Sequence, residues 1–125
     1  MANKIGIVIK TDGTLERLDL SESEQELKSL QNAVGGYVQV VELEDDFTMW
    51  ANEEGKLLNL PVNEIATVIW EVRFGLDTDI ICGDVVFTGG MDEDGETLTI
   101  SEANIQRLAE LVEGLKSTRT IIKVY

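Results

Sequence analysis

The sequence contains no histidine, one cysteine and one proline in 125 residues. Without histidine, and with Cys82 alone, a single chain lacks the ligands of the common zinc sites, and it has neither a His-dependent triad nor a Cys–His pair. One cysteine forms no disulfide within the chain, which is typical of the reducing cytoplasm. We therefore expect a cytoplasmic protein without a metal or other cofactor.

Long apolar runs are also missing. No stretch of about 18 apolar residues is present, so no transmembrane helix is expected. The start, MANKIGIVIKTDG, lacks the apolar stretch and cleavage site of a signal peptide and is typical of a first strand. With 43% hydrophobic and 27% charged residues, the chain has enough apolar side chains for a core. Its length predicts a single domain spanning residues 1–125.

Basic residues are scarce. The chain has ten lysines and arginines and 24 acidic residues, which gives a net charge of −14 and an isoelectric point near 4.2. Such a surface repels nucleic acid and anionic membranes, so direct binding to either is not expected. Two explanations of the charge stay open. Solubility is the simpler and favoured one; the other is an acidic DNA mimic that blocks a nucleic-acid-binding enzyme.

Hydrophobic periodicity predicts an α+β fold. Strands are expected at residues 4–11, 14–20, 37–43, 47–52 and 97–101, at 79–90 as one strand or as two broken at Gly83, and at 118–125. Helices are expected after Ser21, where Ser21 with Glu24 or Ser23 with Glu26 suggests a capping box, after Asn63 and after Ser101. The order ββαββαβ(β)αβ, with about three helices, favours a mostly antiparallel sheet.

No group of residues suggests catalysis, so we expect a protein that is not an enzyme. The loop around Asp92, Asp94 and Gly95 matches only part of a calcium-binding loop, because the first and twelfth ligands are missing. The glycines of FTGG, residues 87–90, are followed by an acidic loop instead of a helix with a lysine, unlike a phosphate-binding loop.

The few cations are more informative than the many acids. A basic-leaning region near the C-terminus comprises Arg107, Lys116, Arg119 and Lys123. Helix-dipole interactions and surface ion pairs explain them most simply. Alternatively, some converge on a small anion, since the arginine fork matches phosphate oxygens. Aromatic residues offer either core packing or a stacking face for a base; they include Tyr37, Trp50, Trp70 and Phe87.

Three blocks, LQNAVGGYVQVV, WANEEGKLLNLPVNEIAT and DIICGDVVFTG, resemble a family of small proteins from phages and mobile elements that is labelled only as a domain of unknown function. That resemblance implies a phage origin and no known enzyme activity. The layout is also similar to that of phage sponge proteins that oppose the bacterial Thoeris defence. Those proteins sequester a cyclic ADP-ribose signal, and some hold cyclic oligonucleotides, in pockets between the subunits of an oligomer.

The second resemblance implies a non-catalytic homo-oligomer that sequesters a small cyclic nucleotide in the cytoplasm of the host bacterium. An aromatic residue near the strand end at Phe87 would stack on adenine, and Arg107 or Arg119 would hold phosphates. The stretch WANEEGKLLNLPVN is expected to preserve shape, and under this resemblance it would also line the pocket through Asn52, Lys56 and Asn63. The candidate ligand-binding residues are Trp50, Asn52, Lys56, Asn63, Phe87, Thr88, Gly89, Arg107 and Arg119.

Overall fold

A five-stranded antiparallel sheet forms the centre of the protein. The computed structural model describes residues 4–124, and the side chains of residues 4–116. The strands lie in the order β2-β1-β5-β4-β3. They are β1 (Ile5–Ile9), β2 (Leu15–Asp19), β3 (Val38–Glu44), β4 (Phe47–Asn52) and β5 (Val85–Thr88). The helices are α1 (Glu26–Val34), after a 3-10 turn at Ser23–Gln25, α2 (Glu64–Phe74) and α3 (Glu102–Val124). The predicted α+β class is confirmed.

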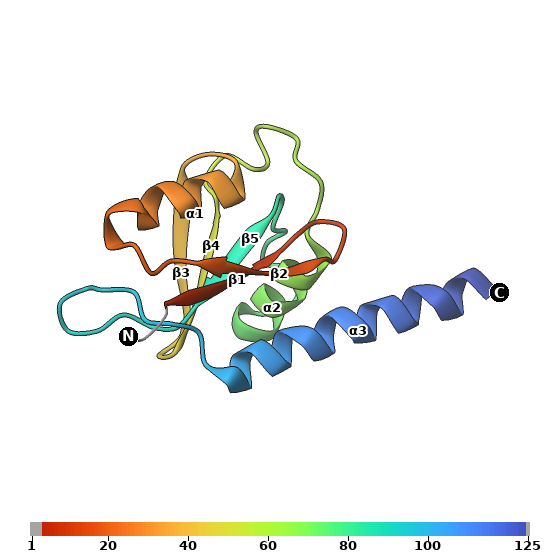
Figure 1. Cartoon of the computed structure of the whole chain (residues 1–125). Coiled ribbons are helices and arrows are strands. Elements are labelled where there is room, and N and C mark those ends of the chain that lie inside the picture. The colour runs from red at the N-terminus through yellow and green to blue at the C-terminus, as the bar shows by residue number, and fades with distance from the viewer. Residues whose placement is uncertain (1–3, 125) are drawn as a thin grey trace.

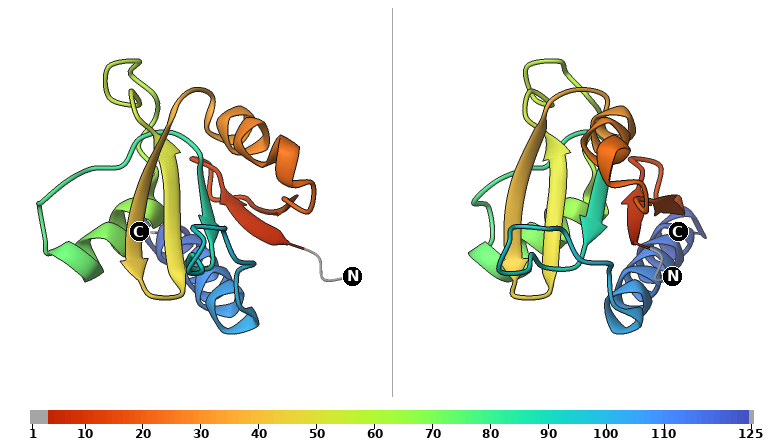
Figure 2. Two further views of the ribbon diagram at one scale, coloured as in Figure 1. Left: turned by 90° about the vertical axis from the view of Figure 1, so that its left-hand side faces the viewer. Right: turned by 60° about the vertical axis from the view of Figure 1, so that its left-hand side comes forward.

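Helices cover both faces of this sheet (Figures 1 and 2). Successive side chains of a strand point to opposite faces. In β4, Met49 belongs to the core beneath α2 and α3, whereas Trp50 belongs to the core beneath α1. Double coverage explains why every residue of β4 and of β5 is buried.

The longest helix, α3, crosses the lower part of the sheet beside α2, and its C-terminal part extends past the sheet (Figure 1). Leu108 and Val112 anchor it in the core that α2 also covers. None of the helices in the described part of the chain has the length and apolar character needed to cross a membrane.

Local signals placed several element ends correctly. The Asp12-Gly13 turn joins β1 and β2, with Gly13 at a φ of 88°. Gly35 ends α1 in the left-handed conformation, with a φ of 80°, and its N–H donates to the carbonyl of Gln31. Ser101 caps α3, because its hydroxyl accepts a hydrogen bond from the N–H of Asn104 at 3.1 Å.

Other predictions were wrong. The capping box is absent: Ser21 accepts a hydrogen bond from the N–H of Lys4, and the Lys4 ammonium binds Glu26 at 2.8 Å. Residues 97–101 form only an isolated bridge between Thr97 and Met91, and the strand expected within 79–90 is confined to β5. The strand expected at 118–125 is wrong, because α3 continues through Val124.

The segment NEEGK forms a turn that packs against the loop before β5. Gly55 is buried, and a Cβ atom at this position would lie 2.6 Å from the carbonyl oxygen of Cys82. The two segments approach so closely that only glycine fits there. This part of WANEEGKLLNLPVN therefore preserves shape, as expected.

Candidate functional site

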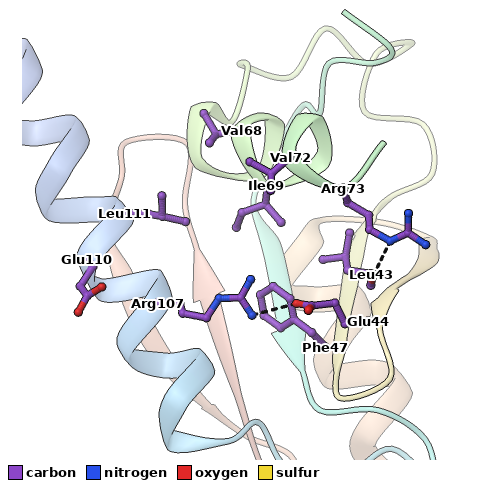
Figure 3. Close-up of a pocket in the computed structure, with 10 residues that line it drawn as sticks. All are labelled: Leu43, Glu44, Phe47, Val68, Ile69, Val72, Arg73, Arg107, Glu110 and Leu111. Atoms are coloured by element: carbon purple, nitrogen blue, oxygen red, sulfur yellow. Dashed lines mark hydrogen bonds and ion pairs between the residues drawn. The ribbon is translucent and has the colours of Figure 1, made fainter. Parts of the chain in front are cut away.

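A groove of about 520 Å³ lies between α2, α3 and the β3–β4 hairpin (Figure 3). Its walls are mainly aliphatic, with an aromatic ring and four charged side chains. The lining residues are Leu43, Glu44, Phe47, Val68, Ile69, Val72, Arg73, Arg107, Glu110 and Leu111. Ligand sites are commonly apolar concavities with a few polar groups, so this groove is the leading candidate site.

Two arginines from different helices converge on the end of β3. The Nε of Arg73, in α2, donates to the carbonyl of Leu43 at 2.7 Å. The Nη1 of Arg107, in α3, donates to Oε1 of Glu44 at 2.9 Å. Leu43 and Glu44 are consecutive, so the two arginines contact neighbouring residues of β3, one through a backbone carbonyl and the other through a side chain (Figure 3).

A β-bulge creates this meeting point. The β3–β4 register shifts between Glu42 and Glu44, which pair with Thr48 and Phe47, so Leu43 is the additional residue. Bulges redirect side chains and are frequent beside functional sites. Here Leu43 is buried in the core, while Glu44 is exposed beside the groove.

The guanidinium of Arg107 lies over an aromatic stack. It is 5.1 Å from the ring centroid of Phe47. Behind Phe47, the ring of Phe87 is stacked at a centroid distance of 5.2 Å and an interplanar angle of 16°. Phe87 is completely buried, so it supports the groove from within and presents no open face to a ligand. The expected stacking role of Phe87 is not compatible with this position.

The electrostatics of the groove differ from those of the whole chain. Two arginines and two glutamates line it, so its formal charge is balanced in a protein of net charge −14. Within residues 4–116, Arg73 has no carboxylate partner, and only its Nε is hydrogen-bonded. Its two Nη groups can therefore donate to an anion.

Trp50, Thr88 and Gly89 lie on the other face of the sheet or at its end, away from Arg107. The indole Nε1 of Trp50 donates to the Thr88 hydroxyl at 2.9 Å, inside the core beneath α1. Gly89 is buried, and a Cβ atom there would collide with the carbonyl of Thr99. All three residues have structural roles in these positions, so the expectation that they bind a ligand is not supported by their placement.

Asn52 and Lys56 lie together in a smaller hollow of about 130 Å³ near Cys82. The Asn52 side chain is buried and occupied: it donates to the carbonyl of Val34 and accepts from the N–H of Glu54. Lys56 pairs with Asp79, and this hydrogen bond lowers the pKa of the Asp79 carboxyl below its usual 3.8. Both residues fasten the turn to its neighbours.

The remaining two candidates lie elsewhere. Asn63 caps α2 by accepting a hydrogen bond from the N–H of Ala66 at 3.1 Å. Its amide also donates to the carbonyls of Ile9 and Gly83, at 2.9 and 3.0 Å. With its side chain fully buried and bonded, Asn63 is a structural residue. Arg119 lies in the C-terminal part of α3, and its side chain is outside those that the structure describes.

Of the predicted residues whose side chains the structure describes, Arg107 alone lines the large groove, and Phe87 supports it. The sequence analysis did not identify Arg73, Phe47 or Glu44. Arg73 carried a usable signal: it is four residues after Ile69, on the same face of α2, in a chain with few cations. In the described part of the chain, no three His, Cys, Asp or Glu side chains are grouped as metal ligands.

Comparison with known proteins gives one match. Residues 4–113 match the family described as a domain of unknown function, DUF3846. No curated protein and no solved structure matches the chain. The match covers the sheet, α1, α2 and the part of α3 that lines the groove. The chain therefore belongs to the DUF3846 family, whose function is not assigned.

Proposed function

We propose that this protein binds a small phosphate-bearing nucleotide in the α2–α3 groove and holds it without chemical change. As the resemblance in sequence implies, its role would be phage counter-defence, in which a cyclic ADP-ribose isomer or a cyclic oligonucleotide immune signal is sequestered. One observation carries the proposal: Arg73 and Arg107 converge on consecutive residues at the mouth of an apolar groove.

The size and chemistry of the groove suit such a ligand. Pockets for small molecules usually measure about 300–1,000 Å³, and this groove, at about 520 Å³, is within that range. Val68, Ile69 and Leu111 offer apolar contacts for a base or sugar. The two arginines offer planar, charged donors for phosphate oxygens.

The side chains of the groove favour holding a ligand over reacting with it. Among the side chains of residues 4–116, none that lines the groove is a serine, threonine, cysteine, histidine or lysine, so this part of the lining lacks the usual nucleophiles. The two carboxylates already have partners: Glu44 accepts from Arg107, and Glu110 accepts from Gln106 at 3.2 Å.

The net charge opposes the approach of an anion, although arginines close to the ligand outweigh it at short range. Repulsion by distant carboxylates is screened by salt. We therefore expect the association rate of a nucleotide to rise with ionic strength, while the lifetime of the complex falls as the arginine contacts weaken.

A second subunit is part of the proposal. The groove is open to solvent on one side, where Val72 is 81% exposed. An oligomer would cover this rim and enclose the ligand. Light scattering with and without ligand measures the assembly, and a monomer that binds with undiminished affinity would remove the oligomer from the proposal.

Thermal unfolding tests the proposed function directly. The purified protein is incubated with cyclic ADP-ribose isomers, cyclic dinucleotides and cyclic trinucleotides, and ligand released by heating is identified by mass spectrometry. At 100 times its Kd, a ligand stabilises the folded state by about 2.7 kcal/mol. For a chain of this length, that is a rise in Tm of about 8–13 °C. Recovery of intact ligand distinguishes a binder from an enzyme.

Matched variants test whether the ligand binds in the α2–α3 groove. Arg73→Ala and Arg107→Ala should each reduce the ligand-dependent rise in Tm, as should Val72→Trp, which fills the rim with little change to the core. Arg17→Ala is the control, because Arg17 is an exposed arginine on β2, at the far edge of the sheet from the groove. A rise in Tm that survives in all three groove variants, or no rise with any nucleotide, contradicts the proposal.

DNA mimicry remains a second candidate, favoured by one feature. The acidic turn at Asp45 and Asp46 touches the start of the acidic loop 91–97, since a Cβ atom on Gly90 would collide with the Asp45 carbonyl. Carboxylates from two separate segments thus gather at one end of the sheet. Salt-sensitive binding to a DNA-binding defence enzyme, without binding of any nucleotide, would favour this candidate.

A further inference from the structure

Arg107 already has hydrogen-bond partners within the groove. Its Nη1 donates to Oε1 of Glu44 at 2.9 Å and to Oδ1 of Asn104 at 2.8 Å. Asn104 is 3% exposed, and its amide donates to the Asp46 carbonyl at 3.2 Å. With the ring of Phe47 beneath it, Arg107 is aimed into the groove by fixed, buried neighbours. Glu44 is its one charged partner among the described residues.

Glu44 is a far weaker attachment than Asn104. Its side chain is 49% exposed, and within residues 4–116 it has no hydrogen-bond partner other than Arg107. A carboxylate this exposed exchanges its ion pair for water at little cost. Asn104, by contrast, cannot turn away without leaving the Asp46 carbonyl unpaired. An incoming anion can therefore replace Glu44 while Asn104 keeps Arg107 in place.

We propose that Glu44 occupies the position of the ligand's acidic group in the free protein and is displaced when the ligand binds. This inference rests on the proposed function. A phosphate oxygen takes the place of Glu44 Oε1 on Nη1 of Arg107, which Asn104 and Phe47 keep in position. Glu44 is then a specificity determinant: a phosphate compensates for the broken ion pair, whereas a neutral nucleoside does not.

Two variants of unchanged side-chain size distinguish the displacement of Glu44 from the general effect of removing one negative charge. Glu44→Gln keeps the size of the side chain but weakens its hold on Arg107. Glu110→Gln removes the same single negative charge from the same groove, yet Glu110 binds Gln106 and not Arg107. The probes are cyclic ADP-ribose and cyclic di-AMP, with adenosine as the neutral reference, and affinities are measured by calorimetry.

Glu44→Gln should bind the phosphate-bearing probe up to about fivefold more tightly than the natural protein, which corresponds to the strength of an exposed ion pair. Its affinity for adenosine should not change. Glu110→Gln should increase the affinity for the phosphate-bearing probe by less than Glu44→Gln does, because it only removes a negative charge. In the natural protein, the carboxyl carbon signal of Glu44 in an NMR spectrum should shift when the phosphate-bearing probe saturates the groove.

The outcomes are distinguishable. Equal affinity of the natural protein and Glu44→Gln overturns the inference and leaves the proposed function standing, as does an equal gain in both glutamine variants. A gain for adenosine as large as that for the phosphate-bearing probes also overturns it. If neither cyclic ADP-ribose nor cyclic di-AMP binds any form, the proposed function fails and the inference fails with it.

Discussion

Replacing Asn63 with alanine should destabilise the fold strongly, because one side chain connects three segments. The Asn63 oxygen caps α2 through the N–H of Ala66, and its amide nitrogen reaches the carbonyls of Ile9 and Gly83. None of these groups is near solvent, since Asn63 is fully buried. Alanine would leave the N–H and both carbonyls without this partner.

The magnitude follows from the number of lost contacts. An N-cap contributes about 1 kcal/mol, and each buried hydrogen bond contributes about 1 kcal/mol. Asn63→Ala should therefore lower the free energy of unfolding by about 2–3 kcal/mol, or the Tm by about 6–15 °C. Asn63→Asp should be at least as harmful, because it keeps the cap but turns a carboxylate oxygen toward two carbonyl oxygens.

Urea unfolding followed by circular dichroism measures this change, assuming two-state behaviour. Ser101→Ala is the matched control, since it removes the cap of α3 at a partly exposed position and should cost about 1 kcal/mol or less. If Asn63→Ala costs no more than Ser101→Ala, the reasoning fails. If it leaves stability intact and abolishes ligand binding, the ligand role expected for Asn63 from the sequence is correct.

Three further changes test other contacts. Gly55→Ala should lower the free energy of unfolding by about 2 kcal/mol or more, because the new methyl group would collide with the Cys82 carbonyl. Urea unfolding measures this loss. Trp50→Phe removes a buried hydrogen bond and should lower the free energy of unfolding by about 1–2 kcal/mol. Trp70→Phe removes an exposed hydrogen bond and should lower it by less than about half as much. Similar losses of stability in the two variants would contradict this reasoning. Asp79→Asn should lower stability by less than about 1 kcal/mol at neutral pH. Since the pKa of Asp79 is lowered below 3.8, this difference in stability should be fully present above about pH 5 and should shrink as the pH falls below 3.8; a difference that grows under acidic conditions would contradict it.

The fold was largely predictable because local patterns and the tertiary structure agree. Asp12-Gly13, Gly35, Asn63 and Ser101 place turns and helix ends by chemistry that acts over a few residues. The failures arose where distant contacts decide. Glu26 was expected in a capping box, but Lys4, 22 residues earlier, binds its carboxylate. Residues 118–124 are rich in β-branched residues yet extend α3, so helix continuation outweighs their strand preference.

The site was much less predictable. The scarcity of cations directed attention to Arg107, which lines the groove, but not to Arg73, because bringing both into one groove depends on how α2 and α3 cross the sheet. The alternation of side chains along a strand explains why Trp50 and Thr88 lie away from the groove: both point to the α1 face, whereas Phe47 points to the groove. A sequence indicates alternation along a strand, but not which helix covers which face.

The short strand β5 has a consequence for how the chain assembles. In the described part of the chain, two hairpins, β1–β2 and β3–β4, are joined in the sheet only through these four residues, which pair Ile7 with Phe87 and Trp50 with Val86. During synthesis on a ribosome, both hairpins emerge before the strand that joins them, so the edges of β1 and β4 that β5 covers stay unpaired until residue 88 has left the exit tunnel. The nascent protein is therefore most exposed to aggregation just before β5 appears, and a chaperone that shields strand edges would be of most use at that moment.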